Sequence, residues 1–246
     1  MKITGSRSGS HHWRVVELRD FADRVAAIAG PARPAIVAIN GRSSSGKSNL
    51  FRRLANTLPD CSVLHTDDLA WHHGVFSWDE LLINDVLPAL RNRRALQYRP
   101  PAWVSRDREG AITVDNGRNF VIIEGVGSSQ ESVWPELDVI IWVQTPQSVR
   151  ESRDAARVAA GEISAKSYAN WMAEENAYMT AGRPWEHADL MGHGATIESQ
   201  PEPAEPPSTR SVENFLGAVP RYFTLYMACT PCTATAFQLP ICSLMS

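Results

Sequence analysis

Short apolar runs, separated by stretches with helical spacing, organise most of this chain. Four of these runs are predicted to be strands, at residues 35–40, 62–65, 120–123 and 139–143. Each run is mainly apolar and does not alternate strictly with polar residues. Strands of that kind are typical of a parallel sheet that is covered by helices on both faces. The hydrophobic pattern therefore predicts an α/β fold.

Helices are predicted between and around these strands. Leu18, Phe21, Val25 and Ile28 recur at helical spacing before the first strand, and residues 49–55 have helical spacing after it. Thr145-Pro146 is a suitable N-cap and first-turn pair for a helix that runs to about residue 160, and a second helix follows it. Residues 96–114 instead favour a hairpin that stands off the sheet and could cover a substrate pocket.

The pattern changes near residue 197, where a Pro-rich segment cannot form a regular element. We expect three parts: an N-terminal extension and helix at 1–33, the main α/β domain at 34–195, and a Pro-rich linker with an irregular C-terminal tail at 196–246. Residues 188–194 are a poor match to the last strand that such a sheet requires.

A Gly-rich loop follows the first predicted strand and has the form G-x-x-x-x-G-K-S. Its glycines let the backbone wrap around an anion, its N–H groups point inward, Lys47 adds a positive charge, and Ser48 offers a hydroxyl to Mg²⁺. A Gly/Ser turn between a strand and a helix is the alternative. The nucleotide-contacting residues that we predict here are Gly41, Arg42, Ser43, Ser44, Ser45, Gly46, Lys47, Ser48 and Asn49.

Two acidic positions follow predicted strands. Asp67 and Asp68 come after the second strand, at the sheet edge where open α/β folds place their sites, and we choose Asp67 as a base for an acceptor hydroxyl. Glu124 ends the third strand and is a candidate to hold Mg²⁺, together with Ser48 and Asp67. The alternatives are that Asp67 and Asp68 cap a turn and that Glu124 is a solvated strand-end acid.

Three arginines recur on the helix after the fourth strand. Arg150, Arg153 and Arg157 have the spacing i, i+3, i+7, so they share one helix face and could close over phosphates, which arginine binds with its planar fork. We predict catalytic roles for Lys47, Arg150 and Arg153 and a nucleotide contact for Arg157. A solvated face that pairs with Glu151 and Asp154 is the alternative.

Net charge and composition argue against some classes of binding partner. The net charge of −3 gives no electrostatic argument for nucleic acid, and no apolar run is long enough to span a bilayer. Only four cysteines occur, and the N-terminus lacks the apolar core of a signal peptide. We therefore expect a soluble, cytoplasmic protein that contacts neither membrane nor nucleic acid, and we leave open whether it forms a homo-oligomer.

With these motifs assembled, roughly residues 34–190 resemble the uridine kinase-like branch of P-loop kinases. The shared order is a Walker A loop, an acid after the next strand, a strand that ends in Glu-Gly, and a lid helix with an R-x-x-R-x-x-x-R spacing. The resemblance implies a P-loop NTPase-type parallel sheet with a hairpin insertion and a helical lid. It also implies ATP and Mg²⁺ as cofactors and phosphoryl transfer to a small-molecule hydroxyl, with a nucleoside such as uridine favoured.

Other functions compete with this one. A nucleoside monophosphate kinase is one alternative, but it needs no carboxylate base such as Asp67. A GTPase-like switch protein is another, but the N-K-x-D sequence that recognises guanine is absent from this chain. A non-catalytic nucleotide-binding protein stays open because of the unusual tail. His65, His72 and His73 favour a polar loop over a metal site. The Cys229-Thr230-Pro231-Cys232 segment is weak support for a zinc or redox site.

Overall fold

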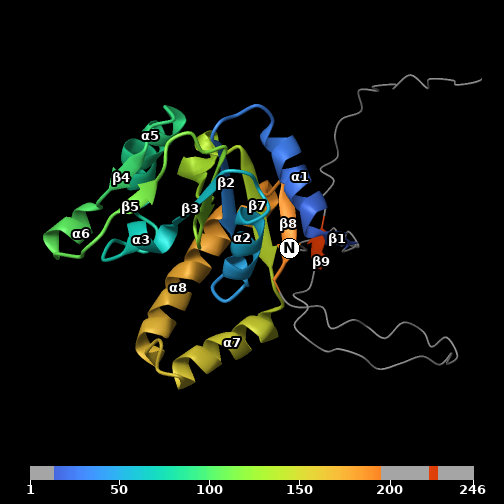
Figure 1. The fold of residues 1–246 in the computed structure, drawn as a ribbon. Coiled ribbons are helices and arrows are strands. Elements are labelled where there is room, and N and C mark those ends of the chain that lie inside the picture. Colours follow the sequence, from blue (N-terminus) through green and yellow to red (C-terminus); the bar gives the residue numbers. More distant parts are fainter. Residues whose placement is uncertain (1–13, 195–221, 227–246) are drawn as a thin grey trace, which may run out of the picture.

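The computed structural model describes residues 14–194 and 222–226 (Figure 1). The predicted Pro-rich linker and Cys229, Cys232 and Cys242 lie outside the described residues. Among the helices that are described, none is long and apolar enough to cross a membrane.

A seven-stranded sheet forms the centre of the molecule, in the order β1-β9-β8-β7-β2-β6-β3. Its last five strands, from β8 to β3, are parallel, whereas β9 pairs antiparallel with both β8 and β1. The α/β fold class is confirmed. The strands are β1 Arg14–Glu17, β2 Ala35–Asn40, β3 Cys61–His65, β6 Phe120–Glu124, β7 Val139–Gln144, β8 Leu190–His193 and β9 Tyr222–Tyr226.

Helices cover both faces of the sheet, and the side chains of β2 are therefore buried on each face. Val37 and Ile39 pack with α1 (Leu18–Ala29) and α2 (Lys47–Ala55) on one face. Ile36 faces the opposite cluster, which holds Leu82 and Leu87. This second face carries α3 Thr66–Ala70, α4 Asp79–Leu81, the π-helical η1 Leu82–Val86 and α5 Leu87–Arg91. Pro88 in the first turn of α5 lacks the N–H group that would continue a regular α-helix from the preceding residues.

A small arm projects from this second face (Figure 1). Its strands β4 (Leu96–Tyr98) and β5 (Ile112–Val114) pair antiparallel, so the paired ends of the predicted hairpin are correct. Between them lies the short helix α6 (Pro101–Ser105) and not a continuous strand. A proline pair explains this difference, because Pro101 stands at the first helical position, where its fixed φ favours a helix.

Two further helices stand off the sheet in the lower part of Figure 1. They are α7 (Gln147–Ala159), which follows β7, and α8 (Ala165–Gly182). Thr145 does not cap α7 with its side chain. It instead donates a hydrogen bond to the carbonyl oxygen of Ser45, 2.6 Å away, and so joins the end of β7 to the Gly-rich loop. The short 3₁₀ helices η2 (Glu131–Glu136) and η3 (Pro184–His187) complete the described elements.

The side of the sheet that is formed by the last strands of the chain, β8 and β9, differs from the expectation. Residues 190–193, a poor strand by sequence, form β8 and pair with β7 over four residues, from Ile141↔Leu190 to Gln144↔His193. Residues 222–226, within the region expected to be an irregular tail, form β9. Pairing with a buried strand supplies the order that the local sequence does not encode.

Candidate active site

The Gly-rich loop connects β2 to α2 at the C-terminal edge of the parallel strands. Gly46 has a φ of +91°, and a Cβ atom there would lie 2.5 Å from the carbonyl oxygen of Gly194, so glycine is required. No side chain caps the first turn of α2. The Asn49 N–H bonds to the carbonyl oxygen of Gly46 at 3.1 Å, so the N–H groups of Lys47 and Ser48 remain available to an anion, as the motif predicts.

Lys47 lies inside the loop that it closes. The residue is 7% exposed, and its Nζ donates to the carbonyl oxygen of Arg42 at 2.9 Å. Burial lowers the pKa of Lys47, while Glu124, Glu175, Asp67 and Asp154 act in the opposite direction. A buried cation surrounded by carboxylates is positioned to pair with a phosphate group.

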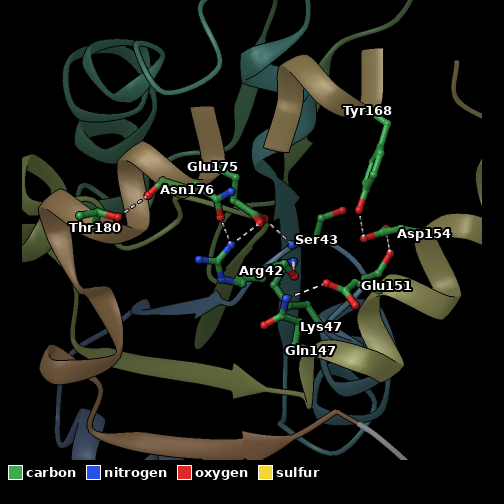
Figure 2. A network of polar contacts seen from close by, with 11 residues as sticks. Arg42, Ser43, Lys47, Gln147, Glu151, Asp154, Tyr168, Glu175, Asn176 and Thr180 are labelled. Atoms are coloured by element: carbon green, nitrogen blue, oxygen red, sulfur yellow. Dashed lines mark hydrogen bonds and ion pairs between the residues drawn. The ribbon is translucent and has the colours of Figure 1, made fainter. Parts of the chain in front are cut away.

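Helix α8 is attached to the loop by a buried carboxylate (Figure 2). Glu175 is fully buried; its Oε1 accepts the N–H of Ser43 at 2.5 Å, and its Oε2 pairs with Arg42 at 3.0 Å. Arg42 also donates to Asn176 Oδ1 at 2.7 Å. The first half of the loop is thus held by α8 before any ligand is present.

Helix α7 is attached in a similar way. Buried Asp154 accepts a hydrogen bond from Ser44 Oγ at 2.5 Å and another from Tyr168 at 3.3 Å. Arg153 donates to the carbonyl oxygens of Ser44, at 2.9 Å, and Gly194, at 3.1 Å. The two helices that the sequence suggests as a lid therefore contact the loop directly.

A cavity of about 890 Å³ opens beside the loop. Most of the candidate residues line it, from four separate elements: the loop residues 43–49, Asp67, Glu124, and Arg153 with Arg157. Gly41 and Arg42 are outside this lining. The structure brings the phosphate loop, both chosen acids and two of the three arginines together around one space.

The two acids are close enough to influence each other. The pKa of Asp67 is raised, chiefly by loss of water around its carboxylate and next by the negative charge of Glu124, while Lys47 lowers it. Glu124 is buried and its Oε2 is hydrogen-bonded to Nδ1 of His65 at 2.9 Å, in the register where β3 pairs with β6. This bond is the main cause of the raised pKa of His65.

Asp68 faces away from the cavity. Its Oδ1 pairs with Arg108 Nη2 at 2.7 Å, and its carbonyl oxygen accepts the indole N–H of Trp103 at 2.9 Å. The Arg108 guanidinium also stacks over the Trp103 ring, 3.4 Å from its centre. Asp68 therefore attaches the β4–α6–β5 arm to α3, and Asp67 is the acid of this pair that faces the cavity.

The three lid arginines do not share one environment. Arg153 and Arg157 line the large cavity, and Arg157 also pairs with Glu162 at 3.3 Å. Arg150 instead lines a second, smaller cavity on the side of β7 and η3. Seven helical residues span about 10 Å, so Arg150 and Arg157 lie at different levels of α7 although they share a face.

Several important residues were not identified from the sequence. Glu175 and Asp154 hold the loop, and buried Asn40 makes four hydrogen bonds at the end of β2: it donates to Ser129 and Tyr178 and accepts from the N–H groups of Gly41 and Gly127. A polar Asn closing an apolar strand was the one available signal.

The donor set is compatible with Mg²⁺. Ser48 offers a hydroxyl and Asp67 and Glu124 offer carboxylates to one cavity, and Mg²⁺ prefers one or two carboxylates and retains several waters. Within the described residues, no cluster of three or more His, Cys, Asp or Glu could form a metal site from the protein alone. Such an ion would therefore be shared with bound phosphates and water.

Comparisons with known proteins find similar kinases. No family model matches the chain. It is 31% identical to nicotinamide riboside kinase 1 of Homo sapiens over a segment of 96 residues, and this segment covers 37% of this chain and 48% of that protein. The chain thus spans about half the length of this relative. The match confirms the resemblance to uridine kinase-like P-loop kinases.

Two solved structures are also similar. One is a possible uridine kinase from Bacillus stearothermophilus, with a TM-score of 0.48, 20% identity, and coverage of 70% of this chain and 98% of that one. The other is described as a fructose transport system kinase from Silicibacter sp. TM1040, with a TM-score of 0.48, 21% identity, and coverage of 70% and 95%.

Proposed function

We propose that this protein transfers the γ-phosphoryl group of ATP to a hydroxyl group of a small molecule. The observation that carries the proposal is that Lys47, Ser48, Asp67 and Glu124 line one cavity beside the open N-terminus of α2. A phosphate loop supplies binding, and a facing carboxylate supplies the acceptor chemistry. These are the two functions that such a transfer requires.

Each group has a role that follows from its place. The loop amides and Lys47 bind the β- and γ-phosphates, and Arg153 and Arg157, which line the same cavity from α7, neutralise charge. Ser48 and Glu124, with Asp67 nearby, would hold Mg²⁺, which neutralises phosphate charge when bound. His65 orients Glu124 through its hydrogen bond.

Asp67 is proposed as the base. Its carboxylate takes the proton of the acceptor hydroxyl while the acceptor oxygen bonds to the γ-phosphorus, and the bond between that phosphorus and the β–γ bridging oxygen breaks to release ADP. The raised pKa of Asp67 makes it a stronger proton acceptor than a solvated aspartate.

The acceptor class follows from the resemblance. The human relative is named a nicotinamide riboside kinase, and a riboside carries hydroxyl groups of the required kind. We propose a nucleoside or related riboside as the acceptor, bound in the cavity beside Asp67.

An ATP-consumption screen tests the proposal. Purified protein with Mg·ATP is offered nucleosides, other ribosides, pantothenate and nucleoside monophosphates, and ADP and phosphorylated product are measured. We expect turnover with one hydroxyl acceptor and none after Lys47→Ala. Turnover with monophosphates alone would favour a phosphate acceptor and contradict the role of Asp67. Tight binding of Mg·ATP with no turnover on any acceptor would indicate a non-catalytic protein.

A further inference from the structure

A second cavity lies on the other side of the Gly-rich loop. Its volume is about 370 Å³, within the range of small-molecule sites, and it shares no lining residue with the phosphate cavity. Its walls come from the end of β7, the first turns of α7, η3 and β8. The residues that the argument uses are Trp142, Gln144, Gln147, Arg150, Trp185 and Met191.

Arg150 is the unusual member of this lining. The residue is 8% exposed, yet within the described part of the chain no hydrogen bond or ion pair engages its guanidinium. The nearby acids are already used: Asp154 accepts from Ser44 and Tyr168, and Glu151 accepts from Gln147. The guanidinium of Arg150 instead lines the cavity, where an anionic ligand could pair with it.

Arg42, the other cation of the cavity, is neutralised by Glu175 at 3.0 Å. The site therefore holds one uncompensated positive charge. A carboxylate carries one negative charge and matches the planar fork of arginine, whereas a phosphate dianion would require further donors.

The rest of the lining favours a flat ring. Trp142 and Trp185 lie edge to face, with centroids 5.8 Å apart, and Met191 adds a polarizable apolar contact. Gln144, which lines the site, uses its carbonyl oxygen to accept the Trp142 indole N–H at 2.8 Å, so its amide N–H groups remain as donors. Gln147 uses its amide group on Glu151, so its carbonyl oxygen remains an acceptor (Figure 2).

We propose that this cavity is a binding site for a small aromatic carboxylate, whose acidic group pairs with Arg150 and whose ring lies against Trp142 and Trp185. The site is separate from the proposed ATP and acceptor sites. It adjoins the phosphate loop through Arg42, whose carbonyl oxygen accepts from Lys47. Occupancy can therefore influence the loop without overlapping its ligand.

Fluorine NMR with para-fluorobenzoate tests the proposal on the full chain, without need of ATP turnover. We expect saturable line broadening of the probe signal. Arg150→Gln should lower the affinity for the probe roughly 10- to 100-fold, as for loss of a charged hydrogen bond. Arg157→Gln is the matched control, because it makes the same change on the same helix beside the other cavity, and it should leave binding unchanged. Trp185→Leu should also weaken binding, which provides a second variant if Arg150→Gln fails to fold.

Three results would overturn the proposal. Equal loss in the Arg150 and Arg157 variants would place the probe elsewhere. Displacement of the probe by Mg·ATP would assign the cavity to the nucleotide site. Equal displacement by para-fluorobenzyl alcohol or inorganic phosphate, used as competitors, would show that ring and carboxylate are not recognised together.

Discussion

Asp67 and Asp68 are adjacent acids with different surroundings, which makes them a matched pair for mutation. We expect Asp67→Asn to lower kcat roughly 10²- to 10⁴-fold with little change in ATP binding, since the proton acceptor is lost while Lys47, Ser48 and Glu124 remain. Asp68→Asn breaks the pair with Arg108, where about a third of each side chain is exposed, so it should cost at most about 1 kcal/mol of stability and change kcat only slightly.

Steady-state kinetics and calorimetric titration with Mg·ATP measure both effects. If Asp68→Asn proved as damaging to kcat as Asp67→Asn, the arm would be the critical element and Asp67 would lose its assigned role. A near-normal kcat in Asp67→Asn would remove that residue from the mechanism.

Cys61, on the edge strand β3, provides a test of local burial. Burial raises the pKa of its thiol to about 12, so very little reactive thiolate exists at pH 8. We expect iodoacetamide to leave Cys61 unmodified in the folded protein and to label it rapidly in urea, as followed by peptide mass mapping. Labelling of folded protein at the rate of a free thiol would contradict the packing of β3 against β6.

At the level of single residues, the sequence predicts groups whose role depends on local motif and misses groups whose role depends on distant contacts. Lys47, Asp67 and Glu124 follow strands or glycines in recognisable positions. Glu175 lies 132 residues from Ser43 along the chain, and only the fold brings the two into contact. Arg150 likewise has no ion-pair partner among residues 14–194, although local spacing suggests ion pairs with neighbouring acids, because the placement of α7 directs it to the second cavity.

At the level of elements, burial explains which predictions are correct. The four runs become β2, β3, β6 and β7, and the central strands β2 and β6 are buried at every position, as expected for strands covered on both faces, whereas the edge strand β3 is only partly buried. Strand β8 contains a Gly and a His and has no such signature; its order comes from pairing with β7. Thr145 satisfies the pattern of an N-cap, yet its side chain does not cap α7 and its hydroxyl donates to the carbonyl oxygen of Ser45.

The attachment of α8 to the phosphate loop is tested by Glu175→Gln. The change keeps the shape but removes the charge that pairs with Arg42, and the Ser43 N–H loses a charged acceptor. We expect a loss of roughly 1–3 kcal/mol in unfolding free energy, and a higher Kd for Mg·ATP because the loop is less well positioned. Urea denaturation and calorimetric titration measure the two quantities.

Glu174→Gln is the control, since Glu174 is the exposed neighbour on the same helix. It should leave both stability and ATP affinity within error of wild type. If Glu175→Gln lowered stability but left ATP affinity unchanged, the contact would serve only the fold and not the shape of the loop.

Over the whole molecule, polar contacts at the C-terminal edge join the sheet, the loop and the two lid helices into one assembly. Asn40 is its centre, because it connects the end of β2 to the loop, to Ser129 after β6 and to Tyr178 on α8. A conventional apolar core lies on each face of the sheet, while this edge relies on satisfied buried polar groups. Deprotonation of one of these buried groups should therefore lower the unfolding free energy of the whole protein.

Tyr178 is that group, and its pH dependence has a definite sign. Burial raises the pKa of its phenol to about 12, above the value of about 10 in an unfolded chain. The stability that it contributes is complete below pH 10 and is lost as the pH rises to 12, by about 1.4 kcal/mol at pH 11. The Phe side chain of Tyr178→Phe has no proton to lose. The unfolding free energy of this variant, measured by urea denaturation, should therefore fall less between pH 8 and pH 11 than that of wild type, by about this amount. Both proteins retain Cys61, whose raised pKa contributes equally to each measurement. Equal losses would mean that the phenol is solvated and that α8 does not close on the end of β2.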